Sequence, residues 1–298
     1  REDVVLGFAN VADYAATHNW ELQCRMHWTH ELPRPGEWRG DGIIAYAGIS
    51  RSMRPARRRL LALVRRAEVP VVETQELGNF LGAPKVFVPS EAIGRMAAEY
   101  FLGLSFRHFG FVTFDENPLE QRRRLGFQRT VELGGGKFHA LTPRSLARRI
   151  ARLPKPMALL AVNDPNALEV LLRCRDAGFR VPEEFAIIGV DDTEIICDLA
   201  AVPLTSINCN FEQQGYEAAA LLDRLMAGRR PPATPILIPP RGVTVRRSTD
   251  TVAIPDLGTA RMLRFLRDHY RERRGIQQIA RELGVSLRRV HGHFRRHV

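Results

Sequence analysis

Several features that define other protein classes are scarce or missing in this chain of 298 residues. Its four cysteines, at positions 24, 174, 197 and 209, are widely spaced and form no CxxC pair, so we expect buried, reduced thiols. No segment approaches the roughly 20 continuous apolar residues of a membrane span. We therefore expect no membrane partner.

Motifs of the common enzyme classes are missing as well. The run from Gly134 to Lys137 lacks the spaced glycine and trailing Ser/Thr of a phosphate loop, and the sequence contains no GxSxG elbow. Asp191 and Asp192 are adjacent and point apart, which suits acid–base catalysis poorly. His291 and His293 have no carboxylate or cysteine at ligand spacing. We expect no enzyme, no cofactor and no metal site.

Positive charge is concentrated at one end of the chain. Residues 257–298 contain eleven arginines, no lysines and three acids, which gives +8 of the total net charge of +11. A basic module beside a nearly balanced body favours nucleic-acid binding. A solvated basic helix or a disordered tail is the alternative.

The apolar pattern predicts an α/β fold with parallel sheets. The runs 157–162 and 185–190 are continuously apolar and bounded by turn residues, as in strands buried on both faces. The remaining expected strands are 21–27, 42–47, 69–73, 85–89, 109–114 and 204–208, and the expected helices are 3–19, 55–67, 91–104 with Ser90 as cap, 118–133, 143–152, 164–177 and 211–227. Asn163 and Asp191 follow the two buried strands, at the edge where open α/β sheets bind ligands.

Spaced blocks in this half of the chain resemble the sugar-sensing core of LacI/GalR-type repressors, which are relatives of periplasmic sugar-binding proteins. The blocks are Asn163–Leu168, Val181–Glu184, Ile187–Asp192, Pro203–Ile207 and Arg246–Thr249. The resemblance implies a two-lobed, periplasmic-binding-protein-like domain with two Rossmann-like sheets over residues 1–248. It also implies chain crossings between the lobes near 89–108 and 200–210.

Three effector-binding residues carry over from the resemblance. Arg123 matches the arginine of the R-x-x-G-[FW] block, Asn163 the N-D block, and Asp191 the first acid of the G-[FVY]-D-[DN] block. A guanidinium, an amide and a carboxylate together satisfy neighbouring sugar hydroxyls. Other interpretations stay open, because an arginine run is typical of a solvated helix face, Asn163 suits a helix cap, and paired aspartates often begin a turn.

Two positions depart from the family pattern and leave the identity of the sugar open. Pro89-Ser90 stands where the family commonly has Asp-Asn, and Cys209 stands where it often has Gln.

The basic end predicts an all-α helix-turn-helix domain over 257–298, after a linker at 249–256. Ala280, Gly284 and Val285 have helix-turn-helix spacing, and the stretch 284–296 resembles an AraC-type DNA-binding domain, of which this chain holds the first motif only. Its expected DNA-binding residues are Ser286, Arg288, Arg289, His291, His293, Arg295 and Arg296. We expect Arg288 and Arg289 to contact bases, and Arg295 and Arg296 to contact phosphates.

A sensor followed by an AraC-type module predicts a bacterial, cytoplasmic, sugar-responsive transcription regulator of pentose (xylose-like) catabolic genes. We expect a homodimer on double-stranded promoter DNA, with a pentose-like effector that closes the cleft. We also expect a chain truncated at both ends, since it opens at Arg1 inside a predicted helix and stops after one motif. A solute-binding protein of a sugar transporter is the alternative, and a sugar-modifying enzyme is a third possibility.

Overall fold

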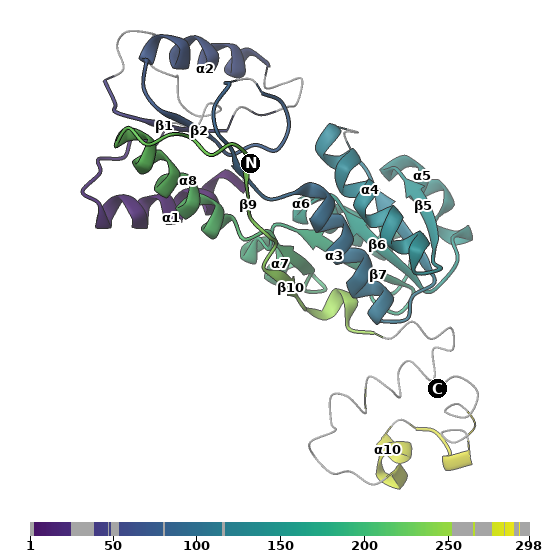
Figure 1. The fold of residues 1–298 in the computed structure, drawn as a ribbon. Helices are drawn as coiled ribbons and strands as arrows, with labels where there is room; N and C mark the ends of the chain where they lie inside the picture. Colours follow the sequence, from purple (N-terminus) through teal and green to yellow (C-terminus); the bar gives the residue numbers. More distant parts are fainter. Residues whose placement is uncertain are drawn as a thin grey trace. The chain divides into compact units, whose positions relative to one another are not determined.

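The computed structural model describes residues 3–24, 39–46, 48, 54–79, 81–114, 117–251, 265, 276–282, 284–288 and 292. The chain divides into two compact units, each formed by segments that are distant in sequence (Figure 1). Unit 1 comprises Arg1–Ile93, Asp115–Arg123 and Asn208–Arg241, and unit 2 comprises Gly94–Phe114, Arg124–Ile207 and Gly242–Val298. Within the described ranges, no helix is long and apolar enough to cross a membrane.

Unit 1 is built on short parallel strand pairs. Its elements are α1 (Asp3–Thr17), β1 (Ile43–Ala45), α2 (Arg54–Ala67), β2 (Val71–Glu73), β3 (Val86–Phe87), α8 (Phe211–Met226) and β9 (Ile236–Leu237). β1 pairs with β2 and β3 pairs with β9, and a parallel bridge from Glu73 to Lys85 joins the two pairs. Gln214 of α8 donates hydrogen bonds to the carbonyls of Thr74 and Val86, so this helix is tied to the backbone of both pairs.

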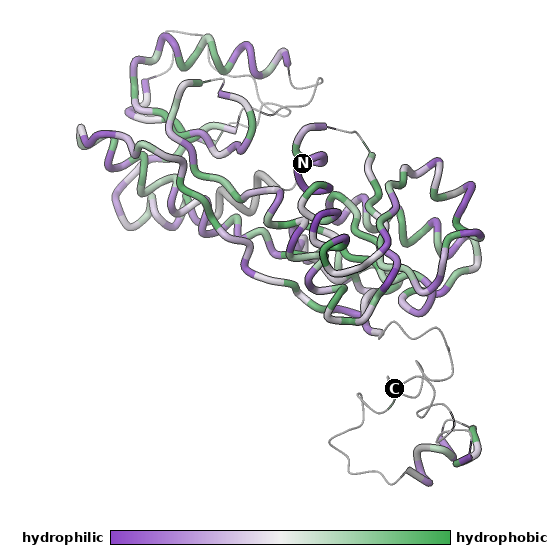
Figure 2. The backbone as a smooth tube through the Cα atoms, turned by 45° about the vertical axis from the view of Figure 1, so that its right-hand side comes forward, coloured by the Kyte–Doolittle hydropathy of each residue, from purple (hydrophilic) through white to green (hydrophobic). Residues whose placement is uncertain are grey.

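Helix α1 packs along α8, as Figure 1 shows. Tyr14 carries this contact, because its ring meets Tyr216 of α8 edge-on and its hydroxyl donates to Asp223 Oδ2 at 3.3 Å. Helix α2, at the top of Figure 2, alternates hydrophilic and hydrophobic residues, and its Leu63 is buried. This is the pattern of a surface helix with one apolar face.

Unit 2 contains one six-stranded sheet in the order β10-β8-β7-β6-β4-β5. Its strands are β4 (His108–Val112), β5 (Lys137–Leu141), β6 (Met157–Ala161), β7 (Phe185–Val190), β8 (Thr205–Asn208) and β10 (Gly242–Thr244). The pairs from β5 through β4, β6 and β7 to β8 are parallel. The helices are α3 (Ser90–Gly103, which begins in unit 1), α4 (Pro118–Leu133, likewise), α5 (Pro143–Arg149), α6 (Asp164–Asp176), α7 (Glu194–Leu199) and the short 3-10 turns η2 (Ile150–Arg152) and η3 (Arg247–Thr249).

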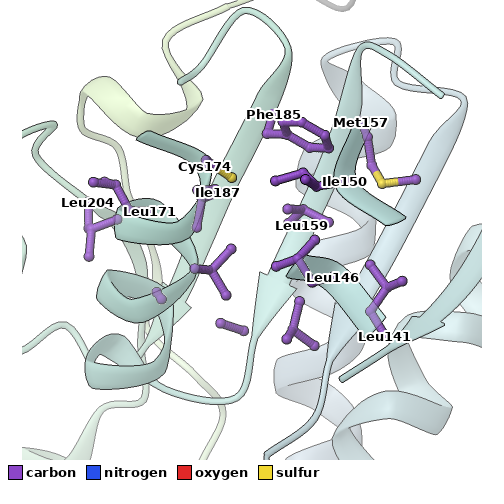
Figure 3. Packing of buried hydrophobic residues seen from close by; sticks show 14 of the residues in the cluster. Leu141, Leu146, Ile150, Met157, Leu159, Leu171, Cys174, Phe185, Ile187 and Leu204 are labelled. Carbon is purple, nitrogen blue, oxygen red and sulfur yellow. The ribbon is translucent and has the colours of Figure 1, made fainter. Parts of the chain in front are cut away.

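Helices cover both faces of this sheet. On one face, the rings of Phe109 and Phe111 lie 6.3 and 6.4 Å from that of Phe127 on α4. On the other face, Val112 belongs to a buried cluster with side chains of α5, α6, β6 and β7, part of which Figure 3 shows. The labelled members are Leu141, Leu146, Ile150, Met157, Leu159, Leu171, Cys174, Phe185, Ile187 and Leu204. Burial on both faces explains why the strands are continuously apolar.

Two local predictions are wrong: the strand expected over 21–27, at its described residues, and Ser90 as the cap of the helix expected over 91–104. Residues 21–24 form no strand, and Cys24 is exposed, whereas the other three cysteines are buried thiols, as expected. Helix α3 begins at Ser90 itself, and the Ser90 N–H donates to Glu76 Oε2 at 3.0 Å. A side chain from a distant loop therefore binds the end of this helix in place of a local cap.

The expected linker starts too early. Ser248 and Thr249 lie in η3 and are 0% and 1% exposed, and the Ser248 hydroxyl donates to the carbonyl of Ile187 at 2.6 Å. Thr205 of β8 contacts both residues. Its N–H donates a hydrogen bond to Ser248 Oγ, and its hydroxyl forms a hydrogen bond with the hydroxyl of Thr249. These polar residues are buried through hydrogen bonds to a strand, so the packed unit extends past Ser248 into the first residue of the expected linker.

Candidate functional site

The ends of β6 and β7 bring two predicted site residues to the same edge of the unit 2 sheet. Leu160 of β6 pairs with Ile188 of β7 in parallel register. Asn163 and Asp191 each lie three positions beyond this pair, so the register carries both side chains past the carboxyl edge together. This edge is where open α/β sheets bind ligands.

Asn163 is the N-cap of α6. Its Oδ1 accepts from the Asn166 N–H at 3.0 Å, as the capping interpretation predicted. Capping employs the amide oxygen, and Nδ2 donates to no residue in the part of the chain that the structure describes. The same side chain can therefore begin the helix and donate a hydrogen bond to a ligand.

Asp191 begins a turn with unusual backbone geometry. Its φ is 102° and that of Asp192 is 58°, both in the region that favours glycine. The Asp191 N–H donates to the Ile207 carbonyl at 2.9 Å, which ties the turn to β8, and its side chain is only 6% exposed. Non-glycine residues persist in such conformations where the surrounding structure imposes them, often at functional sites.

A buried carboxylate that the sequence analysis did not select supports this turn. Asp164 is fully buried, its Oδ1 accepts from Ser206 Oγ at 2.6 Å, and its Oδ2 accepts from the Thr193 N–H at 2.7 Å. Burial raises the pKa of Asp164 to about 6, against the opposing effect of the bonds from Ser206 and Thr193. Its position next to Asn163 was the available signal, but an acid in the first turn of a helix has an ordinary explanation in the helix dipole.

The carboxylate of Asp192 accepts hydrogen bonds from Arg246 and Thr244 on the other side of the turn. Arg246 donates to Asp192 Oδ1 through Nη1 at 2.8 Å and to Asp198 Oδ1 through Nε at 2.6 Å, while Thr244 Oγ1 donates to Asp192 Oδ2 at 2.5 Å. One guanidinium thus holds the turn and α7 together. Of the two adjacent aspartates, Asp192 is therefore committed to holding the turn.

Arg123 belongs to α4 and to unit 1, whereas Asn163 and Asp191 belong to unit 2. Its side chain is partly buried. Its neighbour Arg122 is half-exposed and pairs with the buried side chain of Glu76 at 2.9 Å. The role of Arg123 toward a ligand stays a prediction.

The two positions that depart from the family pattern are not ordinary surface residues. Ser90 is 3% exposed and Cys209 is fully buried. Cys209 directly follows β8, and Asn210 after it has a left-handed backbone with φ 61° and is the N-cap of α8.

The C-terminal part is described only in pieces. Helix α10 (Ile276–Glu282) ends in a Schellman-type turn, in which Val285 N–H donates to the Ala280 carbonyl at 2.9 Å and Gly284 N–H to that of Arg281 at 3.1 Å. Gly284 has φ +64°, which explains the glycine, and Ala280 is 3% exposed. Ser286 and Arg288 are exposed. The predicted DNA-binding residues Arg289, His291, His293, Arg295 and Arg296 lie outside the described residues.

Comparison with known proteins identifies the domain. Residues 98–249 match the model of the periplasmic binding protein-like domain family. The xylose operon regulatory protein of Escherichia coli strain K12 is 32% identical over 153 residues, which cover 51% of this chain and 39% of that protein. The HTH-type transcriptional regulator DegA of Bacillus subtilis strain 168 is 26% identical over 221 residues, covering 70% of this chain and 64% of that protein.

Solved structures agree on the fold. The structure of the xylose-binding transcription activator xylR superimposes with a TM-score of 0.72 at 22% identity, covering all of this chain and 80% of that one. The transcriptional regulator CelR in complex with cellobiose gives a TM-score of 0.64 at 21% identity, covering 83% and 78%. At this identity the likeness shows the α/β architecture with parallel-sheet lobes.

Proposed function

Because the chain belongs to the periplasmic binding protein-like domain family, we propose that it is the sensing part of a sugar-responsive transcription regulator. The observation that carries the proposal is the edge of unit 2, where Asn163 and Asp191 extend past paired strands on a hydrogen-bonded turn. Curated relatives named as transcription regulators support the regulatory role. The matched region spans 39% of the xylose operon regulatory protein, so the activity of the whole protein is part of the proposal.

The proposed effector is a small sugar of the pentose type. A carboxylate accepts from hydroxyls and an amide donates to them, so Asp191 and Asn163 offer complementary groups to a polyol. A relative named as a regulator of the xylose operon and a similar structure described as xylose-binding support a pentose. We include Arg123 as a third binding residue and a ligand-dependent closure of the two units as the response.

A thermal-shift screen of pentoses and hexoses tests the sensor. We expect one pentose to raise the melting temperature, and Asp191→Ala to weaken its binding by about 1–3 kcal/mol because the partner hydroxyl loses its acceptor. Calorimetry on Asp191→Ala, Asn163→Ala and Arg123→Ala measures each residue, with Arg122→Ala as the matched control. Unchanged affinity in Asp191→Ala overturns the site assignment.

The C-terminal part is proposed to bind double-stranded promoter DNA as an AraC-type helix-turn-helix. The Schellman turn at Gly284, the buried Ala280 and the exposed Arg288 support this module. We expect Arg288→Ala and Arg289→Ala to weaken binding at the cognate site by roughly 1–3 kcal/mol. We expect Arg295→Ala and Arg296→Ala to weaken binding to every sequence and to reduce the salt dependence.

The proposal also includes a homodimer in the cytoplasm of a bacterium and the absence of enzymatic turnover. Ile195 and Leu199 of α7 are 64% and 79% exposed, and their i, i+4 spacing places them on one helix face, which supports association. Light scattering on the parent and on Leu199→Asp tests the dimer. Chromatography of any bound sugar after incubation tests for turnover, and a product that disappears in Asp191→Asn favours an enzyme instead.

A further inference from the structure

We propose that Asp164 is a positioning residue for the effector site: its carboxylate sets the backbone of the turn that presents Asp191. The inference rests on the proposed function for the nature of the ligand. The geometry of the turn stands independently of it, since every contact involved lies within unit 2.

The contacts converge on the turn from two directions. Asp164 Oδ2 accepts directly from the Thr193 N–H at 2.7 Å. Asp164 Oδ1 accepts from Ser206 Oγ at 2.6 Å, and Ser206 Oγ in turn accepts from the Asp192 N–H at 3.0 Å. Two successive amides after Asp191 are therefore fixed by one carboxylate, one of them directly and the other through a hydroxyl.

The sequence also makes space for this carboxylate. A Cβ on Gly189, the residue two positions before Asp191, would lie 2.1 Å from Asp164 Oδ1. Any side chain at position 189 would thus displace Asp164 from Ser206. A strand interior does not otherwise favour glycine, and close approach of another group is a recognised reason for it.

An ionised group at this position costs stability. Burial raises the pKa of Asp164 to about 6, whereas its ordinary value is 3.8. The charged or titratable groups around it are Asp192, which raises the pKa further, and the thiol of Cys197, which lowers it by hydrogen bonding, while Arg246 is bound to Asp192 and Asp198. At neutral pH the folded chain therefore keeps a buried carboxylate ionised, although a neutral group of the same shape would be buried at lower cost.

The cost of burying this charge makes it possible to distinguish a positioning role of Asp164 from a purely structural role. An amide has a donating NH2 group at one of the two positions that Oδ1 and Oδ2 occupy, so it can accept at only one of the places where Ser206 and Thr193 donate. The amide removes the buried charge but loosens the turn. A positioning role thus predicts that Asp164→Asn keeps or gains thermal stability at pH 8, whereas the backbone of the turn at Asp192 and Thr193 becomes less ordered. A structural role predicts a loss of stability.

The experiment compares Asp164→Asn with Asp176→Asn, a change at the exposed far end of the same helix. Amide hydrogen exchange at Asp192 and Thr193 is measured by NMR, and calorimetry is carried out at pH 8 with a sugar that shifts the melting of the parent. In Asp164→Asn we expect the hydrogen-exchange rate of these amides and the Kd for the sugar each to rise roughly tenfold. We expect no change in Asp176→Asn. Ser206→Ala, which removes one of the two contacts, should give the same direction if Asp164→Asn folds poorly.

A pH series adds a readout that packing alone does not move. Protonation of Asp164 in the parent removes the same acceptor, so sugar affinity should fall as the pH decreases through about 6, whereas affinity in Asp164→Asn should stay flat. Unchanged exchange at Asp192 and Thr193 in both Asp164→Asn and Ser206→Ala overturns the inference, with or without a sugar. If no sugar binds the parent, the proposed function fails, and the exchange rates alone decide the role of Asp164.

Discussion

Each unit of the chain buries a carboxylate completely, and the two are treated differently by their surroundings. Asp164 in unit 2 accepts hydrogen bonds at both oxygens, from Ser206 and Thr193. Glu73 in unit 1 has no hydrogen-bond partner at either oxygen among the described residues, and Lys85 Nζ lies 3.8 Å from its Oε2. Burial raises the pKa of Glu73 to about 7 against the opposing charge of Lys85, compared with about 6 for Asp164.

The difference shows what keeps a buried carboxylate ionised. Short hydrogen bonds to both oxygens replace the lost water more completely than one cation at a longer distance. Unit 2 therefore holds a defined anion at neutral pH, close to the proposed effector site. Unit 1 holds a group that is partly protonated near pH 7 and that no donor among the described residues positions.

The largest expected effect tests how closely unit 2 is built around its carboxylate. Gly189→Ala places a methyl group 2.1 Å from Asp164 Oδ1 in a fully packed strand. We expect the free energy of unfolding to fall by about 3 kcal/mol. Gly103→Ala at the end of α3 is the control, because its Cβ meets nothing within 4 Å, and it should be neutral or slightly stabilising. Urea unfolding of both variants measures the contrast, and equal stabilities contradict the tight fit.

The next effect concerns the pH dependence of unit 1. Because the pKa of Glu73 is raised in the folded state to about 7 from 4.5, its contribution to stability is present below pH 4.5 and is lost as the pH rises through 7. Between pH 5 and 8 we expect this group to lower the free energy of unfolding by roughly 2 kcal/mol. Glu73→Gln should remove that part of the slope.

Unfolding at pH 5, 6.5 and 8 in the parent, in Glu73→Gln and in Glu194→Gln, an exposed control, isolates the contribution. The histidines His108 and His139 have lowered pKa values through burial, so they oppose the trend on the acid side in all three proteins alike. If the free energy of unfolding depends on pH in Glu73→Gln as it does in the parent, Glu73 is not the source of the slope.

A smaller effect is expected at the ion pair that holds the turn of unit 2 from outside. Arg246→Ala leaves Asp192, whose side chain is 12% exposed, without its guanidinium and should cost about 1–2 kcal/mol. Arg175→Ala removes an ion pair whose side chains are 61% and 69% exposed, and we expect a change within about 0.5 kcal/mol. Arg246→Lys should not restore stability, because a single ammonium cannot bind Asp192 and Asp198 in the same geometry. Denaturant midpoints rank the three variants.

The smallest expected effect lies in unit 1, where α1 and α8 share one long hydrogen bond. Tyr14→Phe removes the 3.3 Å bond to Asp223 but keeps the ring contacts, so we expect a loss of about 0.5–1 kcal/mol. Tyr216→Phe, at a side chain that is 44% exposed, is the matched control. Thermal melting distinguishes them, and a larger loss in Tyr216→Phe contradicts the ranking.

Local patterns in the sequence predicted most elements of both units, but β5, α7 and β10 of unit 2 and β9 of unit 1 were not expected. The expected strands 157–162 and 185–190 correspond to β6 and β7, and the expected helix 118–133 is α4, because long apolar or periodic runs report their own burial. The strand expected over 21–27 is absent at its described residues, the strand expected over 85–89 is reduced to the two residues of β3, and β9 also has only two residues. Such short strands exist through their pairing, which a local pattern does not contain.

The sequence alone determined the alternation of apolar strands and amphipathic helices, and with it the placement of Asn163 and Asp191 directly after two buried strands. Only the tertiary structure decided that Asp192 is bound by Arg246, 54 residues away, and that Asp164 binds Thr193 and Ser206, 29 and 42 residues away. The physical reason is that burial is encoded in the local spacing of apolar residues, whereas a polar side chain takes its role from partners that only folding brings within hydrogen-bond distance.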